Sequence, residues 1–209
     1  MKHNCLNVVV QKVAANLEVL PIPERVDFLS RTARSAASES ARLNGLELDD
    51  FPKTTKGEPL PCNQVYWSLT HKTAYAGGVA SLTPAGIDLE FMRPIAMKIY
   101  DRVASNKEWQ LAINAGLDSR RGFFMFWTAK EALLKRLGVQ NGFYKGLSDC
   151  VVEEIGADNS MTILSCGRKF YRVRYFDFDG HLAAICADDD HVCWHLLNEE
   201  GGYVKNQYC

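Results

Sequence analysis

Four side chains that can bind a metal ion and a phosphate group stand at strand and helix spacings in two short stretches of the sequence. In residues 86–90, Asp88 and Glu90 alternate with two aliphatic residues, and this period of two predicts a strand with both carboxylates on one face. Glu131 and Lys135 lie four positions apart among good helix formers and therefore share one helix face. Three carboxylates and one ammonium group on two rigid elements are suited to bind a divalent cation together with a phosphate.

Each of these pairs also has an ordinary explanation when it is considered alone. Asp88 and Glu90 can form the solvated face of a strand, whereas Glu131 and Lys135 can form a surface ion pair. Lys130 falls within the apolar arc of the same helix, where we expect either a snorkelling lysine or a partly buried ammonium group paired with the acidic strand. Only the combination of the two stretches favours a magnesium site, because Mg²⁺ prefers hard oxygen ligands completed by phosphate and water.

Basic side chains outside these stretches are further candidates for binding an anion. His71 stands at the end of a predicted strand and is followed by Lys72, so this turn is suited to an anion. The other phosphate candidates lie on the first predicted helix and in the loop after it: Arg31, Arg34, Lys53 and Lys56. Each of them alone is a solvated charge in most proteins.

A zinc site is a less favoured alternative. His191, Cys193 and His195 alternate and could share a strand face, but they would need a fourth ligand, and no partner motif accompanies them. The sequence also lacks a Walker loop, a G-x-G-x-x-G motif and a G-x-S-x-G motif.

The composition is that of an ordinary globular protein, with 209 residues, 47% hydrophobic content and a net charge of -1. This charge provides no global basic field, so we expect no nucleic-acid partner. Seven scattered cysteines without a Cys-x-x-Cys pair predict free thiols in a reducing cytoplasm. No stretch approaches the ~20 apolar residues of a membrane span, and the apolar run at residues 8–10 is too short for a signal peptide. We therefore expect a soluble cytoplasmic protein without a membrane partner.

The elements that must position these residues can be predicted from periodicity and from turn residues. We expect strands at 5–13, 64–69, 75–81, 86–90, 150–155, 161–165, 169–177, 181–187 and 192–197, and helices at 24–43, 96–104, 106–115 and 119–137. Asn44-Gly45 and Gly138 are the expected stops of the two long helices. The strands from 64 to 90 predict an antiparallel meander, and the order of strands, helices and strands predicts an α+β fold. Residues 73–81 and 179–187 resemble one another, which hints at an internal duplication.

With these stretches together, the sequence resembles the 4'-phosphopantetheinyl transferase superfamily. The family pattern G-(I/V)-D-x-E is present at residues 86–90, and its later partner W-x-x-K-E-(A/S)-x-x-K is present at residues 127–135. Residues 90–94 resemble the family's E-x-x-R-P, and residues 67–71 resemble its F-(N/S)-(I/L)-S-H-(S/T) strand end. The resemblance covers about residues 24–150, and the joint motif is specific although each half alone is not.

The resemblance implies the fold and the activity of the larger monomeric type, which activates peptide synthetases and similar assembly lines. The implied fold is an α+β pseudo-dimer of two similar halves, residues 1–97 and 98–209, with coenzyme A in the cleft between them. The implied reaction transfers 4'-phosphopantetheine from coenzyme A to a serine of an apo acyl or peptidyl carrier protein and releases adenosine 3',5'-bisphosphate.

The resemblance also implies roles for individual residues. Mg²⁺, or Mn²⁺ in its place, would be held by Asp88, Glu90 and Glu131. The implied catalytic residues are Glu131, Lys135 and His71. The candidates for contacts with coenzyme A are Arg34, Lys53, Lys56, Thr70, His71, Lys72, Lys130 and Lys135.

Three positions depart from the family pattern, of which Thr70 in place of serine is a mild departure. Glu58 stands where the family often has the basic residue of G-K-P, and Lys72 stands where it has a small hydroxyl residue. We expect the phosphate contact missing at Glu58 to be supplied by Lys72, Lys56 or Lys53. Two alternative functions are a magnesium-dependent phosphohydrolase or nuclease, which would need no carrier, and a non-catalytic relic that binds coenzyme A. The relic is disfavoured because no metal carboxylate is lost.

Overall fold

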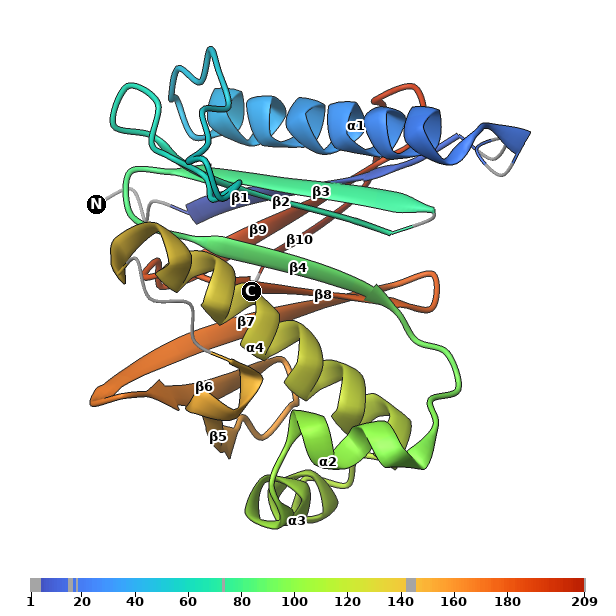
Figure 1. The fold of residues 1–209 in the computed structure, drawn as a ribbon, viewed down its shortest axis with the longest axis vertical. Coiled ribbons are helices and arrows are strands. Elements are labelled where there is room, and N and C mark those ends of the chain that lie inside the picture. The colour runs from blue at the N-terminus through green and yellow to red at the C-terminus, as the bar shows by residue number, and fades with distance from the viewer. Residues whose placement is uncertain (1–4, 15–16, 18, 73, 142–145, 209) are drawn as a thin grey trace.

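Two five-stranded sheets and two long helices make up most of the molecule (Figure 1). The computed structural model describes residues 5–14, 17, 19–72, 74–141 and 146–208. The strands are β1 (Cys5–Lys12), β2 (Tyr66–Lys72), β3 (Tyr75–Ser81), β4 (Gly86–Phe91), β5 (Cys150–Ile155), β6 (Met161–Cys166), β7 (Lys169–Phe178), β8 (His181–Cys186), β9 (His191–Leu197) and β10 (Tyr203–Tyr208). The helices are α1 (Ile22–Leu43), α2 (Tyr100–Val103), α3 (Asn106–Asn114) and α4 (Ser119–Asn141), with short 3₁₀ turns η2 (Met97–Ile99) and η3 (Leu147–Asp149).

The strand order confirms the predicted α+β class. The first sheet has the order β10-β9-β1-β3-β2, and the second has the order β4-β8-β7-β6-β5. Neighbouring strands are antiparallel, apart from β1 and β9, which run parallel. The predicted helix stop after α1 is also confirmed, because Asn44 is the C-cap and Gly45 adopts φ +68°.

The two sheets lie face to face between the two long helices, which gives a four-layered molecule (Figure 1). Val79 of the first sheet and Ile87, Phe176 and Ile185 of the second belong to the core cluster between the sheets. Helix α1 covers the outer face of the first sheet, and α4 covers the outer face of the second. Because side chains alternate along a strand, every second residue of β4 points away from the sheet interface and toward α4.

Small residues allow α1 to lie close to the first sheet. A Cβ atom on Gly78 of β3 would lie 2.4 Å from the backbone nitrogen of Ala37, so only glycine fits there. Ala33, Ala36 and Ala37 of α1 are fully buried against the sheet. Among the described helices, none is both long enough and apolar enough to cross a membrane.

The partner of one strand differs from that predicted, and one strand was not predicted. β4 pairs with β8 of the second sheet, so the predicted meander is wrong in its third strand. β9 lies beside β1, and β10, which was not predicted, lies beside β9 at the edge of the first sheet. The two sheets therefore interleave along the chain, and the predicted boundary at residue 97 does not separate them. A local pattern identifies a strand but carries little information about its partner.

One predicted helix end is also wrong. Helix α4 continues through Gly138 to Asn141. Gly138 is not among the glycines with positive φ, so it does not form the left-handed cap that ends many helices.

Candidate active site

The candidate site lies where the edge strands of the two sheets adjoin. β2 is the last strand of the first sheet, and β4 is the first strand of the second. The backbone N–H of Ile87 donates to Ser68 Oγ over 3.2 Å, and the hydroxyl of Thr70 donates to Asp88 Oδ1 over 3.3 Å. These contacts join the two edges and bring the carboxylates of β4 beside the end of β2.

Glycine at position 86 allows α4 to approach this seam closely. A Cβ atom on Gly86 would lie 2.0 Å from the carbonyl oxygen of Ala132 and 2.6 Å from the backbone nitrogen of Arg136. Any larger residue would therefore push the helix away from β4. The close approach places the outward face of β4 against the helix face that carries Glu131 and Lys135.

A cleft of about 410 Å³ opens at this seam. Most of the predicted site residues line it, which places side chains from β2, β4, α4 and the loop before β2 around one space. The lining residues are Ser30, Ala33, Lys53, Leu69, Thr70, His71, Lys72, Asp88, Glu90, Trp127, Glu131 and Lys135. The predicted alternation in β4 is confirmed, since Ile87 and Leu89 are fully buried between the sheets on the opposite face.

Asp88 is buried, and only one of its two carboxylate oxygens has hydrogen-bond partners among the described residues. Lys135 Nζ lies 2.8 Å from Asp88 Oδ1 and donates a second hydrogen bond to the carbonyl oxygen of Ile87 over 3.0 Å. Among the described residues, Asp88 Oδ2 has no hydrogen-bond partner although it is buried. A buried carboxylate oxygen without a partner is unfavourable, and it is suited to accept a cation from the cleft.

Glu90 is held by two donors at the same oxygen. Lys72 Nζ lies 2.8 Å from Glu90 Oε1, and the indole N–H of Trp127 donates to that oxygen over 3.1 Å. Burial raises the pKa of the Glu90 carboxyl above its ordinary value, and the negative charge of Asp88 adds to this effect, while Lys72 opposes it.

Glu131 completes the acidic group from the helix side. Burial raises its pKa above the ordinary value, and the negative charges of Asp88 and Glu90 raise it further, while Lys135 and Lys72 lower it. Glu131 therefore has the electrostatic surroundings of a carboxylate with a raised affinity for a proton, as a general base requires.

His71 carries no charge at neutral pH. Partial burial of the ring, followed by the positive charges of Lys135 and Lys72, lowers its pKa below the ordinary value of 6.5. A neutral imidazole in this position can donate a hydrogen bond to a phosphate oxygen without adding charge.

A second cavity of about 270 Å³ continues from the cleft and shares Lys53, Glu131 and Lys135 with it. Glu58 lines this second cavity. Lys53 is therefore the lysine best placed to supply the positive charge that is missing at Glu58, because Lys72 already forms an ion pair with Glu90.

Three predicted coenzyme contacts lie outside the cleft lining. Arg34 is exposed on α1, next in sequence to Ala33 of the cleft wall, and Lys56 is exposed in the loop before β2. Lys130 is fully buried on another side of α4 and pairs with Glu108, so neither of the two alternatives, a snorkelling lysine or a pair with the acidic strand, is correct.

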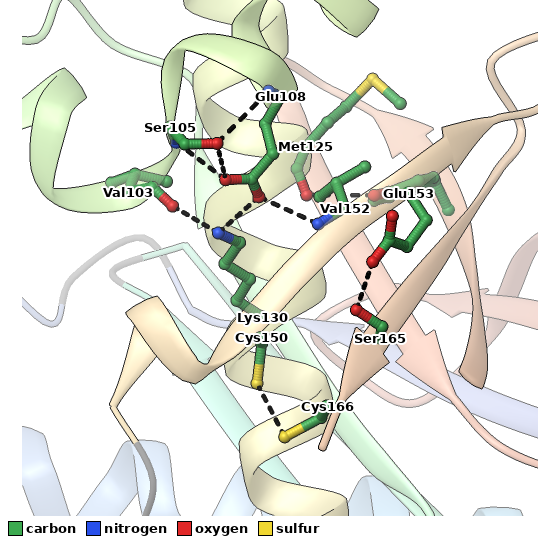
Figure 2. Close-up of polar contacts among 11 residues, drawn as sticks. Val103, Ser105, Glu108, Met125, Lys130, Cys150, Val152, Glu153, Ser165 and Cys166 are labelled. Carbon is green, nitrogen blue, oxygen red and sulfur yellow. Dashed lines mark hydrogen bonds and ion pairs between the residues drawn. The ribbon is translucent and has the colours of Figure 1, made fainter. Parts of the chain in front are cut away.

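The partner of Lys130 is a residue that the sequence did not single out. Lys130 Nζ lies 2.7 Å from Glu108 Oε1 and 2.7 Å from the carbonyl oxygen of Val103 (Figure 2). Glu108 also accepts from the backbone N–H of Ser105 over 2.7 Å and from that of Val152 over 2.9 Å. The S-x-x-E spacing of a capping box at residues 105–108 is the signal that could have identified Glu108.

The carboxylates of the cleft do not form a ready-made metal centre. In the described part of the chain, no group of three or more His, Cys, Asp or Glu side chains is arranged to hold a metal ion. The zinc alternative has no further support, since His195 contacts Asn206 and Asn7 instead. The acidic cluster nevertheless offers hard oxygens. Among the described residues, Asp88 Oδ2 lacks a hydrogen-bond partner, while Asp88 Oδ1 and Glu90 Oε1 are paired with lysines. These residues fit a magnesium ion once a lysine has moved aside.

Comparison with known proteins agrees with the chemistry of this cleft. The model of a family described as the 4'-phosphopantetheinyl transferase superfamily matches residues 84–193, slightly more than half of the chain. This segment contains β4 and α4, and hence all three carboxylates of the cleft.

Individual relatives are similar over parts of the chain. The 4'-phosphopantetheinyl transferase ffp of Bacillus subtilis is 29% identical over 168 residues, which cover 74% of this chain and 69% of that protein. The 4'-phosphopantetheinyl transferase psf-1 of Bacillus pumilus is 27% identical over 126 residues, and this match spans about half of each protein (50% and 53%). A crystal structure of Thermotoga maritima holo-(acyl-carrier-protein) synthase aligns with a TM-score of 0.38 and 22% identity, over 50% of this chain and 61% of that one.

Proposed function

The chain belongs to the 4'-phosphopantetheinyl transferase superfamily, and we propose that it transfers 4'-phosphopantetheine from coenzyme A to a serine hydroxyl of an apo acyl or peptidyl carrier protein. The observation that carries this proposal is the convergence of Asp88 and Glu90 of β4 with Glu131 and Lys135 of α4 on one cleft. The relatives named as 4'-phosphopantetheinyl transferases support the same reaction.

We propose that Asp88, Glu90 and Glu131 hold Mg²⁺, or Mn²⁺ in its place. All three offer hard oxygen ligands, and the buried Asp88 Oδ2 has no partner among the described residues. When bound, the metal supplies positive charge that neutralises the pyrophosphate of coenzyme A.

The side chains around the carboxylates bind and orient the pyrophosphate. Lys135 brings positive charge from the helix side, while neutral His71 and the hydroxyl of Thr70 offer hydrogen bonds from the end of β2. Lys53 lines both cavities and can therefore contact a substrate that extends from one cavity into the other. Arg34, exposed beside the cleft wall, is the candidate for the 3'-phosphate.

The reaction is a phosphoryl transfer in which positioning and charge neutralisation matter most. The serine oxygen forms a bond to the phosphorus on the pantetheine side of the pyrophosphate, and the bond from that phosphorus to the bridging oxygen breaks. The electron pair of the broken bond leaves with adenosine 3',5'-bisphosphate. Glu131, whose pKa is raised by burial and by its acidic neighbours, takes the proton of the serine hydroxyl, directly or through a water molecule.

Both walls of the cleft come from one chain, so we propose that a monomer is active. Five cysteines in the described part of the chain are free thiols, which suits a reducing compartment such as the cytoplasm: Cys62, Cys150, Cys166, Cys186 and Cys193. The net charge of -1 gives no reason to expect a nucleic-acid substrate.

Whole-protein mass spectrometry of apo carrier proteins incubated with coenzyme A, Mg²⁺ and the enzyme tests the proposal. We expect a mass gain of one phosphopantetheine group per carrier and an equal release of adenosine 3',5'-bisphosphate. Cleavage of coenzyme A without a mass gain would instead identify a phosphohydrolase, and binding of coenzyme A without turnover would identify a non-catalytic protein. Asp88→Asn is the control, because any modification of the carrier protein by this variant would not depend on the acidic cleft.

A further inference from the structure

Lys72 is the feature of the cleft that its family pattern does not account for. The residues before it resemble the pattern of the family, but Lys72 stands where that pattern has a small hydroxyl residue. In the structure its ammonium group lies 2.8 Å from Glu90 Oε1, an oxygen that also accepts from Trp127. Lys72 therefore occupies one carboxylate of the proposed metal site.

Two of the lysines that line the cleft, Lys72 and Lys135, together explain how three carboxylates can stand close together. Lys72 pairs with Glu90, and Lys135 pairs with Asp88. Each pair replaces the repulsion between neighbouring carboxylates by an attraction to an ammonium group. The acidic cluster is thus neutralised in large part by the chain itself.

The two lysines differ in how firmly they are held. Lys135 donates to both Asp88 and the carbonyl oxygen of Ile87, and its side chain is 31% exposed. The side chain of Lys72 is 43% exposed, stands at the end of β2, and makes one ion pair. A lysine on a flexible stem near the surface can leave its partner at small cost.

We propose that Lys72 is an internal counter-ion of Glu90, which a divalent cation must displace in order to bind. Mg²⁺ or Mn²⁺ then enters by ion exchange, because the ammonium group leaves Glu90 as the metal arrives. The displaced ammonium group stays at the edge of the cleft, where it is available to an anionic substrate. The proposal rests on the proposed function only for the identity of the metal site.

Binding of Mn²⁺ to the full chain, freed of metal with EDTA and studied without coenzyme A or carrier, tests the proposal. Lys72→Met keeps the length of the side chain without its charge, and Lys72→Ser restores the hydroxyl of the family pattern. Removal of the competing charge should tighten Mn²⁺ binding roughly 3- to 30-fold in both variants. Lys53→Met is the matched control, since Lys53 lines the same cleft without pairing to these carboxylates, and it should change the affinity less than about twofold.

The stability of the same variants gives a second measurement. In EDTA, Lys72→Met should melt at a lower temperature than the wild type, because Glu90 has lost its counter-ion, and saturating Mn²⁺ should narrow this difference. Unchanged or weaker Mn²⁺ binding in both Lys72 variants would overturn the proposal, as would equal tightening by Lys53→Met. Neither of these results would affect the mass-spectrometric test of phosphopantetheine transfer, so the two proposals can fail separately.

Discussion

Replacement of Lys130 by methionine should destabilise the protein strongly without a direct effect on coenzyme A binding. The side chains of Lys130 and Glu108 are 1% and 4% exposed, so the substitution leaves a buried carboxylate without its cation (Figure 2). Breaking a buried ion pair on one side costs about 3–5 kcal/mol. At about 2–4 °C per kcal/mol for a protein of this size, the melting temperature should fall by about 6–20 °C.

The double variant Lys130→Met with Glu108→Gln separates the charge from the hydrogen bonds. The backbone N–H groups of Ser105 and Val152 donate to different oxygens of Glu108, so glutamine, with one oxygen, keeps one of these two hydrogen bonds, and it leaves no buried charge behind. We therefore expect the double variant to be more stable than Lys130→Met alone, by about 1–3 kcal/mol.

The pH dependence of stability should change sign in the single variant. In the wild type, burial opposes ionisation of Glu108, but hydrogen bonds from Lys130, Ser105 and Val152 hold its pKa below the ordinary value of 4.5. Ionised Glu108 therefore contributes stability at neutral pH that is lost as the pH falls below this value. In Lys130→Met, burial remains without the cation, so the pKa should lie above the ordinary value. The variant should then recover part of its lost stability as the pH falls from 7 toward 5.

Urea unfolding at pH 7 and pH 5, together with steady-state kinetics, measures these effects. If Lys130→Met keeps the melting temperature of the wild type but has a much higher KM for coenzyme A, the structural role of Lys130 is refuted. Lys130 would then be a residue that contacts coenzyme A. A double variant no more stable than the single one would show that the charge is not the cause.

Three further substitutions test the cleft itself. Asp88→Asn should abolish transfer while the circular dichroism spectrum stays native, because the change removes a buried carboxylate at the edge of the cleft; a variant with nearly full activity would contradict the metal assignment. Glu131→Gln should slow transfer by ~10²–10⁴-fold, since an amide cannot take the serine proton, and saturating Mg²⁺ should restore the rate only in part; full rescue would leave Glu131 as a metal ligand alone. Arg34→Glu, at an exposed position, should raise the KM for coenzyme A much more than the KM for the carrier protein, and equal changes in both would point to carrier docking.

The local part of the site could be predicted from the sequence because strand and helix periods determine which side chains share a face. The alternation in β4 places Asp88 and Glu90 opposite Ile87 and Leu89, as the structure confirms. The same reasoning cannot identify contacts between distant segments. It placed Lys130 within the apolar arc of α4 and offered snorkelling or pairing with the acidic strand, whereas its partner, Glu108, comes from α3.

Strand partners and edge strands were the least predictable part of the fold. The pattern of β4 is the same whether it pairs with β3 or with β8, because pairing depends on how the intervening helices return the chain. β10 was missed since residues 203–206 are exposed and follow no apolar alternation. In both cases the deciding interactions lie far away along the chain.

The interleaving of the two sheets also determines the order in which the protein can fold during synthesis. β1 needs β9 as its parallel neighbour, and β4 needs β8, so each sheet joins strands that lie far apart along the chain. Contacts between such distant segments form slowly, because a long loop must close before they are made. On the ribosome, β1 lacks β9 beside it and β4 lacks β8 beside it until residues 181–197 have emerged. The nascent chain is therefore most exposed to aggregation just before β8 and β9 emerge.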